Sequence, residues 1–314
     1  MSSSKDVFRS GFVCFVGRPN TGKSTLTNAM VGQKIAITSS RPQTTRHTIR
    51  GIVHREHAQL ILVDTPGLHR PRTLLGQRLN DLVRDTYTEV DVIALCIPAD
   101  EKIGPGDRWI VEQIRLMAPK TKLMGVLTKI DKVSRDQLAA KLIALSELLG
   151  PASEIVPVSA VKGEQVEVLV DVIASQMAEG PAFYPDGDLT DEPEETLMAE
   201  LIREAALEGL DNELPHSLAV VIEDVLEREE NEDTDTDGTR THEGMLDVHA
   251  LLYVERPSQK AIIIGRGGAR LKEIGTNARL QIEKILGTRI FLHLHVKVAK
   301  DWQRDPKQLG KLGF

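Results

Sequence analysis

Cysteine is scarce in this chain of 314 residues, and long apolar runs are missing from it. Its two cysteines, Cys14 and Cys96, lie inside short apolar runs, so we expect small core residues in a reducing compartment. No apolar stretch reaches the about 18 residues that cross a bilayer, and the first residues lack the apolar stretch of a signal peptide. These absences favour a cytoplasmic protein without a membrane span.

Positive charge is in the minority overall, with 39 Lys and Arg against 46 Asp and Glu, but it is unevenly placed. From His249 to Phe314 the chain carries 13 basic and 5 acidic residues. A basic end on an acidic protein indicates a nucleic acid or another anionic surface as partner. Net charge alone leaves an ordinary solvated surface as an equal alternative.

Apolar runs alternate with helix-like stretches through the first half of the chain. The runs predict strands at 12–16, 60–63, 92–97, 123–127 and 154–158, and the stretches predict helices at 24–31, 77–89, 107–116 and 136–149. Strands that are apolar on both faces and separated by helices predict a mostly parallel sheet covered on both sides. An extra strand, Arg50–His54, is expected to form a hairpin with Gln59–Val63.

The length suggests about two domains, and a segment rich in Pro, Gly and acidic residues divides them. We predict a first domain at 1–180, a linker at 181–195 and a second domain at 196–314. In the second domain the expected order is helix 195–210, strands 217–226 and 245–254, helices 258–264 and 269–286, and strand 289–298. The charged stretch 228–243 has too few apolar residues to pack, which predicts a mobile loop.

The most specific motif fits G-x-x-x-x-G-K-[ST] and directly follows the first apolar run. A strand, loop and helix of this kind present backbone N–H groups to nucleotide phosphates. Lys23 would reach the β- and γ-phosphates, and Ser24 would ligate Mg²⁺. A Gly-rich turn without a ligand is the alternative. The residues predicted to bind nucleotide here are Gly17, Arg18, Pro19, Asn20, Thr21, Gly22, Lys23, Ser24 and Thr25.

A second phosphate motif, Asp64-Thr65-Pro66-Gly67, ends a later apolar run. Asp64 can hold Mg²⁺ through water, and Gly67 can offer its N–H to a γ-phosphate and lose that contact on hydrolysis. Both motifs together favour a nucleotide hydrolase.

The base-reading motif is Thr128-Lys129-Ile130-Asp131, which follows a predicted strand. A carboxylate at Asp131 can accept hydrogen bonds from guanine N1–H and from its exocyclic amine, a pair that adenine cannot donate. Because an unpaired buried carboxylate is costly, this motif selects GTP over ATP. Lys129 would pack its stem along the ring, and Ser159-Ala160 would add a backbone N–H to guanine O6.

The order of these motifs resembles the Era family of GTPases, most specifically in Ile37–Gly51 and in Asp64–His69. The resemblance implies GTP hydrolysis with Lys23, Thr45 and Gly67 as catalytic residues. It implies Mg²⁺ held by Ser24, Thr45 and Asp64, with Thr45 favoured over Thr44. One departure is Thr128, which stands where the family has Asn. The hydrogen bonds that this Asn makes to the phosphate loop and to the base are therefore in question.

Leu68 follows Gly67 at the place where Ras-like enzymes carry a water-orienting Gln, so we expect a low intrinsic rate. By resemblance, Asn20 matches an Asn that helps related GTPases bind K⁺. A K⁺ ion there would offset developing charge as an arginine finger does. The alternative is that Asn20 only shapes the loop.

In the second domain, a G-x-x-G turn joins two predicted helices. Glycines let a nucleic-acid backbone approach closely, and the second helix offers N–H groups to phosphate. With flanking apolar helices and nearby cations, this resembles a type II KH domain, which clamps about four single-stranded nucleotides; a turn without a ligand is the alternative. The residues predicted to contact RNA are Lys260, Ile264, Gly265, Arg266, Gly267, Gly268, Arg270, Lys272 and Arg279.

Other residues of this domain have two readings each. Ile262–Ile264 can line a groove under the bases or belong to the core. Trp302 can stack on a base, but we favour an anchor for the chain's end. His293 and His295 form a His-x-His pair that lacks a third metal ligand, which favours an exposed or RNA-facing stripe.

The predicted fold is therefore an α/β P-loop GTPase domain with a mostly parallel sheet, followed by an α+β type II KH domain. The resemblance implies binding near the 3′ end of small-subunit (16S) rRNA during assembly of the small ribosomal subunit. We expect a cytoplasmic protein and take a monomer as the default, since the sequence does not indicate an oligomeric state. Three rivals remain: a P-loop phosphotransferase, an RNA-binding protein with nucleotide as a structural ligand, and a GTPase switch peripheral on the cytoplasmic face of the inner membrane.

Overall fold

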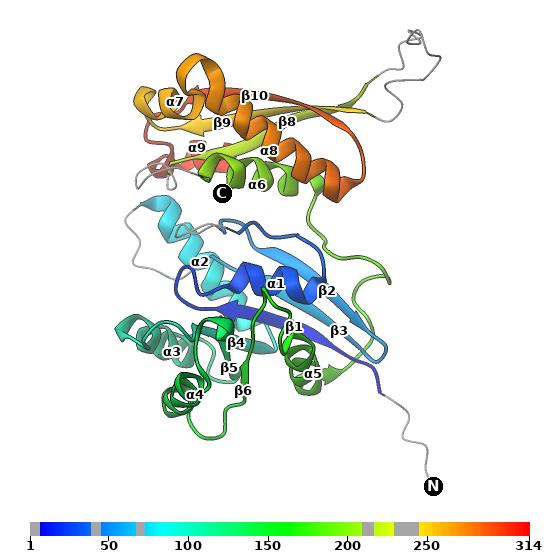
Figure 1. Ribbon diagram of the computed structural model, residues 1–314, viewed down its shortest axis with the longest axis vertical. Coiled ribbons are helices and arrows are strands. Elements are labelled where there is room, and N and C mark those ends of the chain that lie inside the picture. Colours follow the sequence, from blue (N-terminus) through cyan, green and yellow to red (C-terminus); the bar gives the residue numbers. More distant parts are fainter. Residues whose placement is uncertain (1–6, 39–44, 67–72, 209–216, 229–244) are drawn as a thin grey trace. The chain divides into compact units, whose positions relative to one another are not determined.

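The computed structural model describes residues 7–38, 45–66, 73–208, 217–228 and 245–314 (Figure 1). The chain divides into two compact units, Met1–Glu192 and Pro193–Phe314. Among the described residues, no helix combines the length and the apolar character needed to cross a membrane.

The first unit is built on one sheet whose strands follow the order β2-β3-β1-β4-β5-β6. All neighbours on this path are parallel except β2, which is antiparallel to β3, and the short β7 (Ala178–Glu179) adds an antiparallel partner for β1. This confirms the predicted parallel sheet and the predicted hairpin. The path strands are β1 (Arg9–Val16), β2 (Ile49–Arg55), β3 (Ala58–Asp64), β4 (Val92–Pro98), β5 (Lys122–Thr128) and β6 (Ile155–Pro157).

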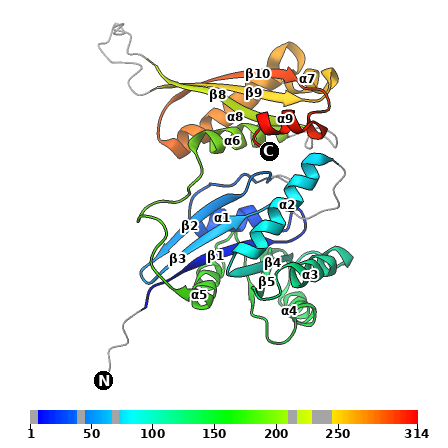
Figure 2. The same cartoon turned by 180° about the vertical axis from the view of Figure 1, so that it is seen from behind.

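Helices cover both faces of this sheet (Figure 2). One face packs on α1 (Lys23–Val31) and α5 (Val166–Gln176), and the other packs on α2 (Leu74–Glu89), α3 (Pro105–Met117) and α4 (Arg135–Leu149). The strands are apolar on both faces because both faces are buried, as the sequence indicates. The loops that follow the parallel strands all emerge at the same edge of the sheet, where α/β proteins bind ligands.

Residues 181–192 belong to the first unit, although the sequence assigns 181–195 to a linker. They run along the open edge of the sheet, where Ile52 N–H donates to the carbonyl of Leu189 at 2.9 Å. Arg50 forms an ion pair with Asp191 at 3.0 Å. Gln59 accepts hydrogen bonds from the backbone N–H groups of residues 183 and 184. The exposed hydrogen-bonding edge of β2 is thereby partly covered.

The second unit contains a three-stranded sheet in the order β10-β9-β8, with β9 parallel to β10 and antiparallel to β8. Helices α6 and α8 pack together against this sheet, α6 on β8 and α8 on β10. The order is α6 (Glu194–Leu207), β8 (Ala219–Glu227), β9 (Leu246–Val254), α7 (Pro257–Ile264), α8 (Ala269–Leu286), β10 (Ile290–Val298) and α9 (Pro306–Lys311). Apart from α9, this is the predicted succession.

Helix α6 ends at Leu207, three residues before the predicted end. Glu208 has an extended backbone, with φ −59° and ψ 134°, and cannot continue the helix. The predicted mobile loop at 228–243 lies, apart from Arg228, outside the described residues.

Candidate functional site

The phosphate-loop motif lies between the end of β1 and the first turn of α1, as predicted. Only glycine fits at position 17, because a Cβ there would stand 2.6 Å from the carbonyl oxygen of Cys96. Gly22 has φ 94° and precedes α1 without offering a side-chain cap. The first N–H groups of α1 thus receive no side-chain hydrogen bond from the cap position and suit an anion.

Lys23 is buried, with 7 % of its surface exposed. Its ammonium donates to the carbonyls of Gly17 at 3.2 Å and Arg18 at 3.0 Å. An ammonium has three donors, so one remains for a phosphate oxygen. Burial lowers the pKa of Lys23, and the nearby charge of Asp64 offsets part of that shift.

Ser24, Thr45 and Asp64 converge although they come from three different segments. The Ser24 hydroxyl donates to Asp64 Oδ2 at 2.7 Å, the Thr45 hydroxyl donates to the same oxygen at 3.3 Å, and the two hydroxyls lie 3.2 Å apart. Asp64 is fully buried, and its Oδ1 has no hydrogen-bond partner among the described residues. Burial raises the pKa of this carboxyl.

A buried carboxylate with one unpaired oxygen, beside two hydroxyls, is a set of hard oxygen donors. Mg²⁺ takes ligands of this kind and usually completes its shell with waters and phosphate oxygens. The three residues therefore fit the predicted magnesium site. The unpaired Oδ1 is the group that a cation or its water would satisfy.

The base-reading segment is shaped by the backbone at Lys129, which has a left-handed φ of 57°. Asp131 follows in a single 3₁₀ turn and accepts a 2.6 Å hydrogen bond from the Ser159 hydroxyl. This bond holds the pKa of Asp131 below its ordinary value, so the carboxylate stays charged for two donors of a guanine edge. Ser159 is buried and also receives the backbone N–H of Lys162 at 3.3 Å.

Thr128 reaches the phosphate loop despite replacing Asn. Its hydroxyl lies 2.6 Å from the carbonyl of Thr21 and 3.3 Å from that of Ile97. The tie between the base-reading segment and the phosphate loop is thus present, made by a hydroxyl in place of an amide. Of the two hydrogen bonds in question, only the one from residue 128 to the base is left without an observed replacement.

Arg18 departs from the expected arrangement, because its side chain is turned toward α3. Its guanidinium is held by Asp107 and Glu101, 2.7 and 2.9 Å away. Sequence reasoning missed these two carboxylates. The available signal was Gly104-Pro105-Gly-Asp107, a helix start with an acid in the first turn, in the connection that follows β4, the strand next to β1.

The other residues singled out in the sequence of the first unit differ in burial, and some lie outside the described residues. Thr65 and Pro66 are buried at the end of β3, while Thr25 and Ala160 are partly exposed. Gly67, Leu68 and Thr44 lie outside the described residues. Cys14 and Cys96 are free and buried, and burial raises the pKa of each to about 12, which confirms them as core residues.

In the second unit the G-x-x-G turn lies between α7 and α8. Gly265, Gly267 and Gly268 all have positive φ, at 72°, 60° and 80°. A Cβ on Gly265 would stand 2.7 Å from Arg270 Cβ, whereas positions 267 and 268 face open space. The turn is exposed at Arg266 and Gly267, so a phosphate backbone has direct access to it.

The cations near this turn divide into two groups. The side chains of Lys260, Arg266 and Lys272 show no hydrogen bond or ion pair within the described part of the chain. Arg270 instead donates to the carbonyls of Ala206 and Glu208 at the end of α6. Arg279 is also engaged, in an ion pair with Glu283 at 3.2 Å.

The structure shows the surroundings of Trp302, Ile262–Ile264 and His293 in the second unit. Trp302 is fully buried and donates to the carbonyl of Ser217 at 3.0 Å, which confirms the anchor. Ile263 belongs to the core, while Ile262 is 49 % exposed. His293 is exposed and stacks on His249 with ring centroids 4.3 Å apart. The described residues contain no group of three side chains suited to a metal.

Comparison with known proteins follows the division into two units. A family described as 50S ribosome-binding GTPase matches residues 12–129, and a KH domain family matches residues 213–303. GTPase Era of Mycolicibacterium smegmatis is 73% identical over 307 residues, which cover 98% of this chain and 99% of that protein. GTPase Era of Mycobacterium leprae is 69% identical with the same coverage.

Two solved structures are similar over nearly the whole length. A variant of Aquifex aeolicus Era bound to GDP and AlF₄⁻ has 34% identity and a TM-score of 0.90, covering 98% of this chain and 99% of that one. Era in complex with MgGDPNP and nucleotides 1506–1542 of 16S ribosomal RNA has 36% identity, a TM-score of 0.89 and the same coverage. The two units, their order and these likenesses agree: this chain is a GTPase that belongs to the Era family, with a KH domain as its second unit.

Proposed function

We propose that this GTPase is a Mg²⁺-dependent switch that binds single-stranded RNA near the 3′ end of 16S rRNA and acts in assembly of the small ribosomal subunit. The observation that carries the proposal is the exposed turn Gly265–Gly268, on the same chain as the nucleotide site and flanked by Lys260, Arg266 and Lys272, whose side chains have no partner among the described residues. The Era structure that is 36% identical holds a 3′ segment of 16S rRNA, which supports this choice of RNA.

In the first unit, Lys23 neutralises phosphate charge with its remaining donor, and Gly17–Thr25 surround the phosphates with backbone N–H groups. Ser24, Thr45 and Asp64 hold Mg²⁺, which offsets charge on the transferred phosphoryl group when it is bound. Asp131 and Ser159 select guanine, with Lys129 and Ala160 beside the base. Gly67 contributes its N–H to the γ-phosphate. Thr45 would leave the magnesium site when the γ-phosphate is lost, as the switch segments of GTPases do.

The second unit supplies RNA affinity. The N-terminal turn of α8 and its preceding glycines receive phosphates, while Lys260, Arg266 and Lys272 attract the backbone by charge. Coupling between the units requires that RNA bind one nucleotide state more tightly than the other. We place this activity in the cytoplasm, where the small ribosomal subunit is assembled.

The test is titration of a labelled single-stranded RNA from the 3′ end of 16S rRNA against protein loaded with GDP or with a non-hydrolysable GTP analogue. We expect tighter, sequence-selective binding in one nucleotide state, with a scrambled RNA as the control. Gly267→Asp should remove that binding. Asp tolerates the left-handed backbone better than most residues, and the site faces open space.

The matched control is Gly287→Asp at the other end of α8. Gly287 also has positive φ, 71°, and also faces open space. The two variants add the same charge to the same unit, so a difference between their RNA affinities would show that the turn itself binds RNA. Equal loss in both variants, or equal binding of both RNAs in both nucleotide states, would reduce the basic end to a general polyanion surface.

We further propose that K⁺ binds beside Asn20, which has a left-handed φ of 63° in the phosphate loop. Such an ion would stabilise the negative charge that develops on the phosphate oxygens during hydrolysis, which the apolar side chain of Leu68 cannot do. GTP turnover should then be faster in K⁺ than in Na⁺ at equal ionic strength. Identical rates in the two salts would leave Asn20 with a loop-shaping role alone.

A further inference from the structure

The Arg18 side chain is fixed by the segment that opens α3. Its Nε donates to Asp107 Oδ1 at 2.7 Å, and its Nη2 donates to Glu101 Oε2 at 2.9 Å. The arginine stem also crosses Gly106, where an added Cβ would stand 3.2 Å from Arg18 Cδ. Arg18 of the phosphate loop is thus attached to the segment that leads from β4 into α3.

Asp107 is the buried centre of this attachment. Its side chain is 0 % exposed, and its second oxygen, Oδ2, accepts the backbone N–H of Gly104 at 2.8 Å. A buried carboxylate needs a charged partner, and among the described residues Arg18 is the cation that pairs with it. Removing either partner leaves the other charge poorly compensated.

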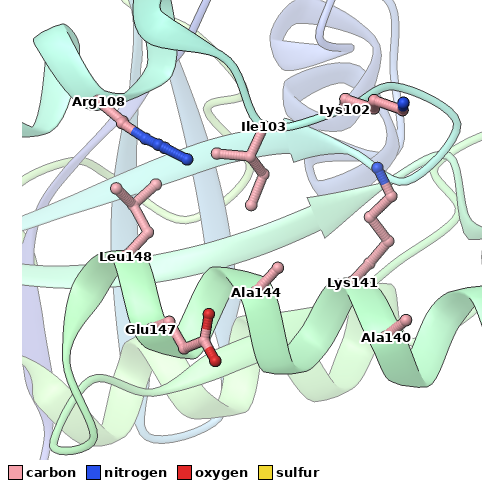
Figure 3. A pocket seen from close by; sticks show the side chains of 8 residues that line it. All are labelled: Lys102, Ile103, Arg108, Ala140, Lys141, Ala144, Glu147 and Leu148. Atoms are coloured by element: carbon pink, nitrogen blue, oxygen red, sulfur yellow. The ribbon is translucent and has the colours of Figure 1, made fainter.

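The segment that carries these acids is itself held from α4. The Lys141 ammonium donates to the carbonyl of Glu101. Figure 3 shows this lysine reaching from α4 toward the loop before α3, at the rim of a cavity of about 540 Å³ that Arg108 and Leu148 also line. The segment that holds Arg18 is therefore itself held in place by α4.

The backbone of Arg18 connects this support to the phosphate-binding lysine. The Arg18 carbonyl accepts from Lys23 Nζ at 3.0 Å and from the Thr21 hydroxyl at 3.1 Å. The residue whose side chain Asp107 holds is thus the residue whose carbonyl orients the Lys23 ammonium. All of these contacts are between protein atoms, so they can form without a ligand.

We propose that Asp107 is a positioning residue for the nucleotide. By holding Arg18, it sets the phosphate loop so that the Lys23 ammonium and the loop N–H groups already face the phosphates. Preorganisation of this kind raises affinity because less ordering is left for the binding step. This inference rests on the nucleotide site proposed above and adds to it a carboxylate that does not touch the ligand.

The direct test is Asp107→Asn. An amide has one acceptor oxygen, so it can serve Arg18 or Gly104 but not both. We expect GDP to dissociate about tenfold faster, the factor that corresponds to one lost charge-assisted hydrogen bond. The KM for GTP should rise by a similar factor, while kcat changes less than about twofold, because the loop contacts support ground state and transition state alike.

A double-mutant cycle with Arg18→Gln separates positioning from general weakening. If Asp107 acts through Arg18, the double variant binds GDP no more weakly than the weaker single variant. If the fold-losses of GDP affinity in the two single variants multiply in the double variant, the two residues act independently and the proposal is wrong. Single variants that melt at lower temperature but bind GDP as the wild type does well below melting would also overturn it.

Two controls bracket the result. Glu167→Gln removes a charged pair with Arg55, between β2 and α5, in which neither side chain bonds the phosphate loop within the described part of the chain, and should leave GDP dissociation unchanged. Lys23→Ala should abolish GDP binding. If Lys23→Ala binds GDP normally, the proposed nucleotide site is wrong. If it does not bind while Asp107→Asn behaves as wild type, only the positioning role fails.

Discussion

The GTPase unit buries key polar groups of its nucleotide site and bonds them to other residues of that site, whereas the KH unit leaves the cations proposed to bind phosphate exposed. Lys23, Asp64 and Thr128 are 7 %, 0 % and 4 % exposed, and each is hydrogen-bonded to another residue of the site. Arg266 and Lys272 are exposed, and their side chains have no partner within the described part of the chain. The two units thus achieve recognition by different physical means.

The difference has consequences for how each unit responds to change. In a buried network, removing one member leaves other groups unpaired, so losses are large and not additive. Exposed cations act mainly through screened charge, so their losses are small, additive and dependent on salt. Substitutions in the two units should therefore differ in the size, the additivity and the salt dependence of their effects.

The largest effect is expected for Asp131→Asn in the GTPase unit. The amide can accept from only one of the two guanine donors and turns its own N–H₂ toward the other, so GDP affinity should fall about a thousandfold, through one lost charge-assisted hydrogen bond and one guanine donor left unpaired. Xanthine carries a carbonyl where guanine carries its amine, so the variant should gain affinity for xanthosine diphosphate. Competition binding with both nucleotides measures the two changes.

The control for this prediction is Asp136→Asn, five residues further on. Asp136 is exposed in the first turn of α4, so the same chemical change there should leave both affinities unaltered. Guanine preference that survives in Asp131→Asn would remove Asp131 from the base site.

Much of this site could be predicted because its motifs follow buried strands. Apolar runs located β1, β3 and β5, and parallel strands bring the loops after them to one edge of the sheet. Helix α5 was not predicted, since Val166–Gln176 is rich in β-branched residues that favour strands. It forms a helix because Val166, Leu169, Val170 and Ile173 share one buried face.

What could not be predicted are pairings between distant side chains. Asp107 lies 89 residues from Arg18, and no local pattern joins them. The bonds of Arg270 to the end of α6 are similar, since nothing in the sequence near the G-x-x-G turn indicates them. Local signals thus give elements and motifs, while the partners of charged side chains depend on how those elements pack.

An intermediate effect is expected for Thr128→Val, which keeps the shape of the side chain but removes its hydroxyl. The carbonyl of Thr21 would lose its 2.6 Å partner inside a buried site. An unpaired buried carbonyl costs about as much as a tenfold loss of affinity, so GDP should dissociate about tenfold faster. Stopped-flow displacement of a fluorescent nucleotide measures this rate.

Thr121→Val is the matched control, since Thr121 precedes the other end of β5 and its hydroxyl bonds the carbonyl of Tyr87. It should alter GDP dissociation less than about twofold. If both variants behave alike, the hydroxyl of Thr128 contributes to stability and not to the phosphate loop.

A smaller effect is expected in the KH unit for Arg266→Ala and for Lys272→Ala. Each should weaken RNA binding several-fold and reduce the salt dependence by about one phosphate contact. The double variant should show the sum of the two free-energy changes, since the residues act separately. RNA titrations over a range of salt concentrations measure both quantities. A loss of unfolding free energy in these variants would contradict the exposed, unpaired description.

The smallest effect on RNA is expected for Arg270→Ala, although Arg270 is close to the same turn. Its guanidinium is already bound to the carbonyls of Ala206 and Glu208, so it stabilises the junction of α6 and α8. Losing a charged donor to helix-end carbonyls should reduce the free energy of unfolding by about 1–2 kcal/mol, as urea denaturation measures. RNA affinity well below the unfolding midpoint should change less than about twofold. An RNA loss as large as that of Arg266→Ala would show that Arg270 leaves α6 to contact the ligand, and the division between engaged and available cations would then fail.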